Sequence, residues 1–389
     1  MQVTAIIAEW NPLHRGHLLP VQAARQQGAT HIVAILSGNF VQRGEPALCP
    51  WQYRAAAALS SGVDLVLQLP LPYAVSTAQH FAGGAMASLA ALGAVDSLIF
   101  GSECGELAAL QSVTAALDSP ELPAALAPHL QKGLPFAAAR QAAVHSLLGE
   151  DAGLLSSPNN ILGIEYLRAL RQLGSNIQPL TISRQGASHD AAEPDTDFPS
   201  ASQLRQRFLT GQDISSSLPP AMAEQLELAR QRGALPQLEL WERAFLARLR
   251  AMTETDYAAL PDVTEGLEHR LYRASRTAKT TEELLAEAKT KRYTHARLRR
   301  VLLAPAGLSA VEPPYLRVLG FTAKGAEILN RAKGRHTLPL SASLAELERT
   351  GEAAARFAAL EARAADLYHA FTPGLAPCGS EYITPVIKI

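Results

Sequence analysis

Short apolar runs alternate with helical stretches over the first half of the chain, and this order of elements constrains the fold more than any other feature. Four short runs are rich in Val, Ile and Leu and stop near Gly, Pro or Ser, as buried strands do. The expected strands are residues 3–8, 31–36, 64–69 and 97–100, and the expected helices are residues 17–27, 50–61 and 77–92. This order predicts an α/β fold with a Rossmann-like parallel sheet, covered by helices on both faces.

The rest of the chain is expected to be mainly helical, and 389 residues exceed what one compact core usually holds. We expect a helical insertion at 104–150, a helix at 159–173, a last strand at 177–183, a polar loop at 185–199, and further helices at 221–252, 281–302 and 341–371. The pattern changes near the SSSLPP stretch at 215–220. The sequence therefore predicts two domains, an α/β domain over residues 1–212 and a mainly α-helical domain over residues 213–389.

Composition limits the classes of function. Hydrophobic residues make up 48% and charged residues 18%, and the formal net charge of -1 means that a nucleic acid would need a local basic patch. Cys49, Cys104 and Cys378 have neither disulfide nor metal-ligand spacing, which is typical of a reducing compartment. Because neither a signal peptide nor a membrane-spanning apolar stretch is visible, we expect a cytoplasmic protein without membrane contact.

A loop with two histidines follows the first expected strand. It reads EWNPLHRGH, and a helix is expected to begin at about His17. Open α/β sheets bind ligands at the carboxyl ends of their strands, and helix N-termini attract anions. Gly16 removes a side chain where a nucleotide could approach the backbone, and His14 and His17 can donate hydrogen bonds to the same phosphates. Two surface histidines in an ordinary loop are the alternative, but this spacing favours nucleotide binding.

Several further blocks join this motif, and together they resemble one known family. The blocks are NPLHRGH at 11–17, SGNFVQRGEPA at 37–47, DLV at 64–66, FGSE at 100–103, SPNNILG at 157–163 and KRYT at 291–294. They are similar to those of the tRNA(Met) cytidine acetate ligases, nucleotidyltransferases related to class I aminoacyl-tRNA synthetases. The resemblance implies activation of acetate with ATP to acetyl-adenylate. The acetyl group would then pass to the wobble cytidine of elongator tRNA(Met), giving N4-acetylcytidine.

The resemblance also implies the site residues, with His14 and His17 as catalytic residues. The implied ATP contacts are Ile7, Ala8, Glu9, Trp10, Asn11, Pro12, Leu13, His14, Arg15, Gly16, His17, Leu18, Leu19, Pro20, Gly101, Asn159, Asn160, Arg184, Ser200, Ser202 and Arg205. Some later positions have a simpler alternative, since Gly101 can be a turn glycine and the Asn and Ser residues can be helix caps. Of the two asparagines, Asn160 is the expected contact, with Asn159 as the second choice. ATP is the expected co-substrate and would bring Mg²⁺, but the sequence shows no cluster of metal ligands. Acetate and the tRNA are the other expected partners, and no obligate protein partner is expected.

A basic stretch lies in the second expected domain. Residues 289–300, KTKRYTHARLRR, hold six Lys and Arg residues and no acidic residue. On a helix, Tyr293, Arg297 and Arg300 would share one stripe, with Leu298 and Leu302 roughly opposite. The stretch can be a solvated face only, but its concentration of charge favours contact with an RNA backbone. The expected tRNA contacts are Lys289, Lys291, Arg292, Arg297 and Arg300.

Two other functions stay open at this level. A nucleotidyltransferase acting on a phosphorylated small molecule would not need the basic stretch. A non-catalytic tRNA-binding protein with a nucleotide-binding fold would not need the complete set of His14, Gly16, His17, Arg184 and Arg205.

The roles of three residues also stay open, and the acetate pocket is expected in the first loop. Arg43 could reach either a phosphate or the tRNA. Trp51, followed by Gln52, and Ser188, before His189, depart from the pattern of the family. The loop of Glu9, Trp10 and Asn11 is the expected wall of the acetate pocket, because it would lie nearest the α-phosphate.

Overall fold

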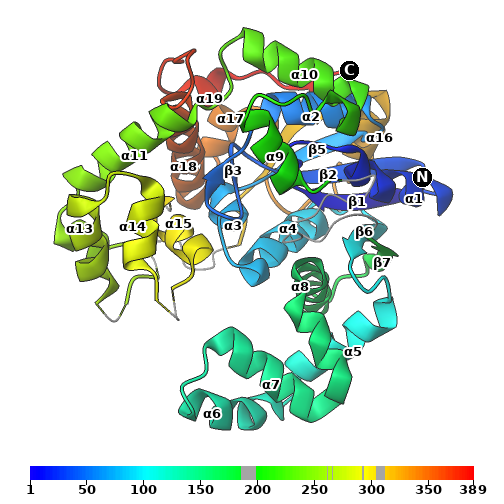
Figure 1. The fold of residues 1–389 in the computed structure, drawn as a ribbon. Helices are drawn as coiled ribbons and strands as arrows, with labels where there is room; N and C mark the ends of the chain where they lie inside the picture. The colour runs from blue at the N-terminus through cyan, green and yellow to red at the C-terminus, as the bar shows by residue number, and fades with distance from the viewer. Residues whose placement is uncertain (185–198, 261, 265, 291–292, 304–311) are drawn as a thin grey trace.

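A sheet of mainly parallel strands forms the centre of the protein (Figure 1). The computed structural model describes residues 1–184, 199–260, 262–264, 266–290, 293–303 and 312–389. The strand order is β10-β8-β5-β2-β1-β6-β7, with β9 beside β8. The strands are β1 (Val3–Ala8), β2 (His31–Ser37), β5 (Leu65–Leu69), β6 (Ser97–Ser102), β7 (Gln178–Ser183), β8 (Leu316–Phe321), β9 (Leu340–Ser341) and β10 (Ile387–Lys388). The five strands expected from the sequence are confirmed, with ends within two residues.

The central strands are parallel and buried on both faces. β1 pairs in parallel with β2 and β6, β2 pairs in parallel with β5, and β6 pairs in parallel with β7. Successive residues of β2 point to opposite sides, so Ile32, Ala34 and Leu36 join one apolar cluster, while Val33 and Ile35 join another. The carboxyl ends of these strands therefore meet at one edge of the sheet, where loops can build a site.

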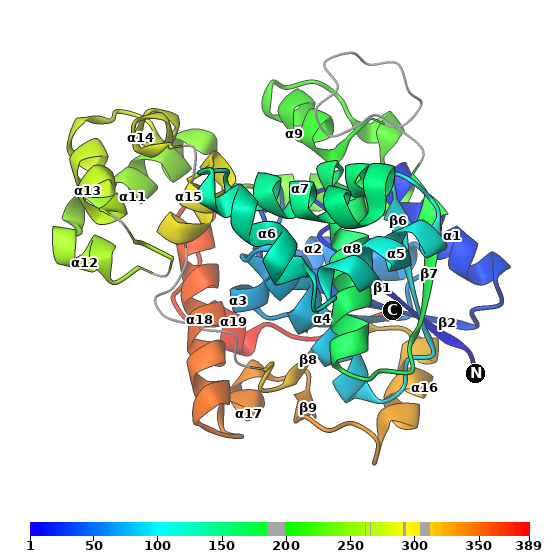
Figure 2. The same ribbon diagram turned by 90° about the horizontal axis from the view of Figure 1, so that it is seen from below.

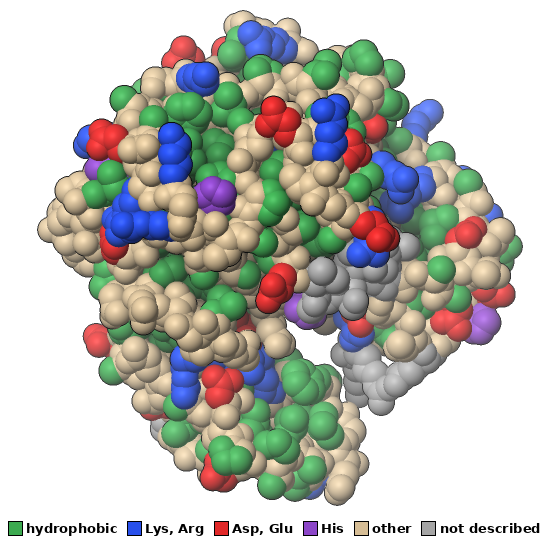
Figure 3. Space-filling view, turned by 180° about the vertical axis from the view of Figure 1, so that it is seen from behind, with side chains coloured by type: hydrophobic (Ala, Val, Ile, Leu, Met, Phe, Trp, Pro, Cys, Tyr) green, Lys and Arg blue, Asp and Glu red, His purple; other side chains and the backbone are tan. Residues whose placement is uncertain are grey.

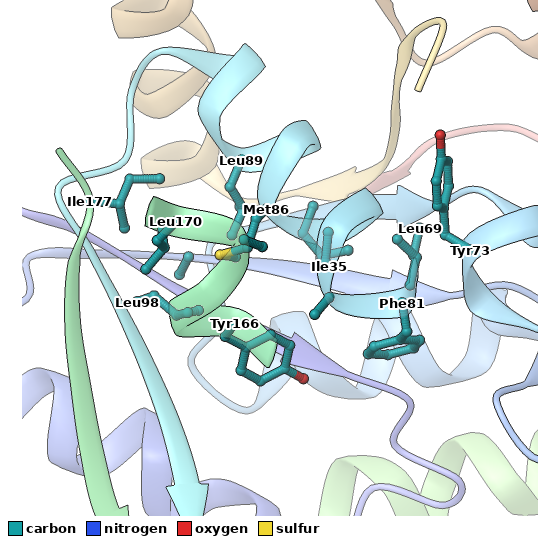
Figure 4. Packing of buried hydrophobic residues seen from close by; sticks show 14 of the residues in the cluster. Ile35, Leu69, Tyr73, Phe81, Met86, Leu89, Leu98, Tyr166, Leu170 and Ile177 are labelled. Carbon is teal, nitrogen blue, oxygen red and sulfur yellow. The ribbon is translucent and has the colours of Figure 1, made fainter. Parts of the chain in front are cut away.

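Helices cover both faces. One face carries α1 (Leu19–Gln26), α2 (Trp51–Ser60), α9 (Ala201–Leu209) and α10 (Pro220–Gln231). The other carries α3 (Leu71–Ala74), α4 (Ala78–Leu92), α5 (Leu107–Leu117), α8 (Pro158–Gln172), α16 (Ala323–Ala332), α17 (Leu344–Glu348) and α18 (Glu352–His369). Figure 4 shows this second core, in which Met86 of α4 and Tyr166 and Leu170 of α8 lie beside the strand residues Ile35 and Leu98. The expected α/β fold is confirmed.

Two groups of helices lie beside this layered core (Figures 1 and 2). At the expected insertion, α5 is followed by α6 (Leu122–Gln131), α7 (Phe136–Leu148) and the 3-10 helix η2 (Gly149–Ser156). The second group, called here the helical lobe, consists of α11 (Leu238–Ala251), α12 (Glu254–Ala258), α13 (Leu267–Thr277), α14 (Thr281–Ala288) and α15 (His295–Leu303). Trp241, Phe245, Leu271 and Leu298 belong to its apolar core. In the described part of the chain, no helix is long and apolar enough to cross a membrane.

The C-terminal part of the chain returns to the sheet, so residue 212 does not divide the chain into two units. β8 lies antiparallel to β5, with Leu65 opposite Phe321, and β10 lies parallel to β8 at the edge. The remaining short helices are η3 (Ser215–Ser217), before α10, and α19 (Ser380–Ile383), before β10. The expected mainly helical domain from residue 213 did not include β8 and β10, which belong to the central sheet. β8 was not expected from the sequence because it contains Arg317, a charged residue that is buried with Glu381 and Gln68 as partners.

Candidate active site

The loop between β1 and α1 holds the two histidines close together. It passes through the 3-10 helix η1 (Arg15–Leu18), and His14 caps its N-terminus. The rings of His14 and His17 stack, with centroids 3.7 Å apart. Nδ1 of His14 accepts a hydrogen bond from the Gly16 N–H at 3.1 Å, and Nδ1 of His17 accepts one from the His14 N–H at 3.2 Å. In the neutral rings, these contacts assign the proton to Nε2 of each ring, which makes each Nε2 a hydrogen-bond donor.

The approach to these histidines is held by buried residues. Trp10 has a φ of 44°, a backbone region that residues other than glycine seldom adopt. Its side chain and that of Leu13 lie in the apolar cluster beneath α1 and α2. The side-chain oxygen of Asn11 accepts a hydrogen bond from the Leu48 N–H at 2.7 Å, and the Asn11–Pro12 peptide bond is cis. Packing on both sides of the turn thus fixes the path of the loop to His14.

Burial of Trp10 bears on one expectation. Its side chain is 2% exposed and packs in the apolar cluster, so it offers little surface to an acetate pocket. The side chain of Glu9 is also engaged, because it accepts a hydrogen bond from the Gln42 N–H at 2.6 Å. Burial raises the pKa of Glu9, while Arg205, Arg54 and Arg43 act in the opposite direction. Of the three expected wall residues, Asn11 is likewise committed to Leu48.

Helix α9 brings a cation to this loop. Ser200 caps the helix by accepting a hydrogen bond from the Gln203 N–H. The side-chain oxygen of Gln203 in turn accepts a hydrogen bond from the Ser200 N–H. Arg205, one turn in, donates to the main-chain oxygen of Asn11 at 2.8 Å and to the hydroxyl of Ser202 at 3.2 Å. Burial lowers the pKa of Arg205. The structure therefore brings the expected residues Ser202 and Arg205 together with the histidine loop.

A second cluster forms where β6 and β7 end. Arg184 donates to the side-chain oxygen of Asn159 at 2.8 Å. Gly101 lies against Arg184, since a Cβ added to this glycine would be 3.0 Å from the Arg184 Cγ. Asn160 is buried, and its side-chain oxygen accepts a hydrogen bond from the Cys104 N–H at 3.1 Å. Of the two asparagines, Asn159 thus faces the expected arginine, while Asn160 secures the loop after β6.

Glu103 organises this second cluster. One carboxylate oxygen accepts from the Asn159 N–H at 3.2 Å and from its side-chain amide at 2.6 Å, and the other accepts from the Asn160 N–H at 2.7 Å. A carboxylate at a helix N-terminus satisfies free N–H groups and the helix dipole. This role of Glu103 was not expected from the sequence, although the residue lies in the FGSE block. A second unassigned residue is the buried Arg54, which donates to the main-chain oxygens of Glu9 and Cys49 at 2.6 and 3.0 Å and to that of Gly38.

The remaining residues of the first loop lie around the two histidines. Ile7 and Ala8 end β1, and Leu18, Leu19 and Pro20 lead into α1 with partly buried side chains. Arg15 is exposed and donates to the main-chain oxygen of Leu218 at 3.5 Å. In the described part of the chain, no group of three His, Cys, Asp or Glu side chains could hold a metal ion.

Helix α15 carries only the end of the basic stretch, residues 295–300, and docks by the two leucines expected. Tyr293 precedes this helix and is buried, so it does not share an outward stripe with Arg297 and Arg300. Leu298 and Leu302 are buried in the core of the helical lobe, which confirms their predicted place. Arg297 pairs with Asp262 at 2.6 Å and lies 4.5 Å above the ring of Tyr293. Arg300 is half-buried, and burial lowers its pKa. Lys289 is exposed, while Lys291, Arg292, Ser188 and the segment 185–198 lie outside the described residues.

Acidic residues from other elements reach this stretch, which the sequence could not show. Arg299 pairs with Glu45 at 2.5 Å and with Glu282 at 3.0 Å. On the face in Figure 3, Lys and Arg side chains are likewise interspersed with Asp and Glu. The same view shows the surface hollowed between the helices of the insertion, at the bottom, and the helical lobe, at the right.

The chain is similar to known proteins over its whole length. Residues 1–379 match the family described as HIGH Nucleotidyl Transferase. A tRNA(Met) cytidine acetate ligase of Syntrophotalea carbinolica is 40% identical over 89% of this chain and 86% of its own. One of Caldanaerobacter subterraneus subsp. tengcongensis is 35% identical with both chains fully covered.

Two solved structures have the same fold. Thermotoga maritima TmcAL in its apo form superposes with a TM-score of 0.92 at 31% identity. The same protein bound with alpha-thio ATP superposes with a TM-score of 0.90 at 30% identity, and each comparison covers both chains completely. The resemblance inferred from the sequence blocks is confirmed. The chain therefore belongs to the tRNA(Met) cytidine acetate ligase family of HIGH nucleotidyltransferases.

Proposed function

We propose that this protein activates acetate with ATP to acetyl-adenylate and transfers the acetyl group to N4 of the wobble cytidine in elongator tRNA(Met). The observation that carries the proposal is the joining of His14, His17 and Arg205 at the carboxyl end of β1. Relatives that share the full length of the chain have this ligase name, and one similar structure contains an ATP analogue.

The first half-reaction depends on positioning and charge. Acetate is ionised at neutral pH, so its oxygen attacks the α-phosphorus of ATP without a general base, and pyrophosphate leaves. Nε2–H groups of His14 and His17 donate to oxygens of the triphosphate as charge builds up on the leaving group. Arg205 supplies a positive charge that the main chain of Asn11 already holds in place. Preorganised donors of this kind lower the barrier because they need no rearrangement during the reaction.

The second cluster suits the nucleoside part of ATP. Gly101 leaves the backbone of β6 accessible beside Arg184, and Asn159 holds the guanidinium group of Arg184. A missing side chain lets a ribose or base approach the main chain closely. This assignment places the triphosphate at the β1–α1 loop and the adenosine toward β6, its neighbour in the sheet.

Mg²⁺ enters this proposal with ATP. The described residues offer no cluster of three carboxylate, imidazole or thiolate ligands. Mg²⁺ commonly keeps several waters and binds through substrate phosphates, and it neutralises charge on the triphosphate when bound. Phosphates of ATP and water would hold this ion, while His14, His17 and Arg205 contribute hydrogen bonds and charge from the protein.

The second half-reaction needs the tRNA to be positioned. The N4 amine attacks the carbonyl carbon of acetyl-adenylate, the bond to the AMP oxygen breaks, and the nitrogen loses a proton. Lys289, Arg297 and Arg300 contact the tRNA backbone, as do Lys291 and Arg292. Phosphate contacts of this kind set the position of the RNA but do not read its sequence. Because tRNA is its substrate, we place the protein in the cytoplasm, acting without an obligate protein partner.

One experiment tests this function against its alternatives. Purified protein is mixed with ATP, labelled acetate and total tRNA, and the digested nucleosides are separated. The proposal predicts label in N4-acetylcytidine, found only in elongator tRNA(Met), together with release of AMP and pyrophosphate. Label in no nucleoside, with nucleotidyl transfer to a phosphorylated small molecule instead, would overturn it in favour of a small-molecule nucleotidyltransferase. Binding of tRNA without any ATP turnover would favour a non-catalytic protein.

A further inference from the structure

A hairpin joins the ATP site to α15, called here the basic helix. It consists of β3 (Phe40–Val41) and β4 (Glu45–Pro46), which pair antiparallel after β2. Phe40 is buried in the core of the helical lobe, with its ring centroid 6.4 Å from that of Trp241 and 6.0 Å from that of Tyr368. The base of the hairpin is therefore fixed by packing.

The tip of the hairpin is anchored on both sides of Arg43. On one side, the Gln42 N–H donates to the carboxylate of Glu9 at 2.6 Å, and Glu9 directly follows β1. On the other side, Gly44 lies against the backbone of α15, because an added Cβ would be 2.7 Å from the Arg300 nitrogen. Gly44 has a φ of 74°, which favours glycine there. Arg43 is thus held between the ATP site and the basic helix.

The charge of Arg43 is available for a ligand. Its side chain is exposed and makes no hydrogen bond or ion pair with any residue of the described ranges. By contrast, Arg297 is paired with Asp262, and Arg299 is paired with Glu45 and Glu282. Arg43 opposes the burial that raises the pKa of Glu9, and its positive charge adds to the burial that lowers the pKa of Arg205. The positive charge of Arg43 therefore acts electrostatically on Glu9 and Arg205 at the ATP site.

We propose that Arg43 binds a tRNA phosphate beside the target cytidine and so serves the acetyl-transfer step but not the activation of acetate. The inference rests on the proposed function above. RNA is favoured over the triphosphate because Gly44 seats the tip of the hairpin on α15, whose backbone it contacts. Arg205 and the two histidines already supply the donors that the triphosphate needs. An exposed arginine on a fixed turn can hold a phosphate by two hydrogen bonds.

The test separates the two half-reactions in the full-length protein. Arg43→Ala should lower kcat/KM for tRNA by about 10- to 100-fold, the range expected for a charge-assisted hydrogen bond. The slope of log Kd for tRNA against log salt should fall by about 0.7 to 0.9, which is one phosphate contact. Acetate-dependent exchange of pyrophosphate into ATP, measured without tRNA, should keep its kcat and its KM for ATP. Arg43→Lys should restore most of the salt slope, because it restores the charge.

Arg349→Ala is the matched control, because Arg349 is an exposed arginine at the end of α17. This variant should behave as the unmodified protein in both assays. A higher KM for ATP in Arg43→Ala would make Arg43 a triphosphate ligand and overturn the inference, as would unchanged tRNA kinetics. If the unmodified protein acetylates no tRNA, the proposed function itself fails, which is a different result from a silent Arg43→Ala.

Discussion

The guanidinium group of Arg205 donates a hydrogen bond to the main-chain oxygen of Asn11 at 2.8 Å, across 194 positions of the chain. This contact ties the start of α9 to the β1–α1 loop. Asn11 is itself fixed through its side chain to Leu48. The position of the cation is therefore set by the same loop that positions His14, and the two act as one unit.

Glu103 should support ATP binding through its neighbours. Glu103→Gln removes the charge that holds the N–H groups of Asn159 and Asn160, and so loosens Arg184. We expect KM for ATP to rise by about 5- to 10-fold, the scale of one helix-capping interaction, with kcat of acetyl-adenylate formation nearly unchanged. Steady-state pyrophosphate exchange at varied ATP measures both constants.

Glu106→Gln is the control for this variant, because Glu106 precedes α5 and its side chain makes no capping hydrogen bond. It should leave both constants unchanged. Equal effects of the two substitutions would show that Glu103 has no special role at the site.

Arg300 should contribute more to tRNA binding than Arg297. Arg297 already donates two hydrogen bonds to Asp262. Breaking this ion pair therefore offsets part of the free energy that a phosphate contact provides. Arg300→Ala should therefore reduce the salt slope of tRNA binding by close to one contact, about 0.7 to 0.9, and Arg297→Ala by less. Asp262→Asn provides the converse test, since removal of the acid should strengthen tRNA binding at low salt. A weaker affinity in Asp262→Asn would contradict this account of the basic helix.

Trp10→Ala should act on stability rather than on the choice of acid. The side chain packs among core residues such as Leu13 and Val21, and removal of a buried tryptophan costs about 3–5 kcal/mol of unfolding free energy. Chemical denaturation should show this loss, while the folded enzyme should keep its ranking of acetate over propionate over butyrate. A relaxed ranking of the three acids without a loss of stability would show that Trp10 does form a wall of the acetate pocket.

Glu361 should make stability depend on pH. It is buried in α18, accepts hydrogen bonds from the Leu71 N–H and from Gln68, and has its pKa raised to about 8, chiefly by burial. The folded protein then binds a proton that the unfolded chain has lost, so unfolding free energy falls as pH rises from about 5 to 8. Glu361→Gln should flatten this dependence, as measured by denaturation at several pH values. An equally steep decline in the variant would mean that Glu361 is ionised in the folded protein throughout this range.

The fold was largely predictable from sequence because its central strands are continuous apolar runs. β8 was not, because Arg317 looks like a surface residue until Glu381, 64 positions later, is seen to pair with it. Ion pairs between distant positions also changed the reading of the basic stretch, where Asp262 and Glu45 reach α15. Local periodicity carries no information on such partners.

The site was partly predictable for a similar reason. The His14 and His17 pair depends on a local turn, so its spacing was visible in the sequence. The direction of the Trp10 side chain, into the apolar core, was not predictable, because proximity in sequence to a reacting group does not tell which way a side chain points. Glu103 was missed because its role appears only when α8 is placed against the end of β6.

Exchange of labelled pyrophosphate into ATP, in the presence of acetate and the absence of tRNA, tests the central claim most directly. The unmodified protein should catalyse exchange that requires acetate. His14→Ala and His17→Ala should each reduce it by about 100-fold or more, the effect of losing one transition-state donor. His129→Ala in α6, outside the site, should have no effect. Near-normal exchange in both loop variants, with the fold intact, would contradict the assignment of this site.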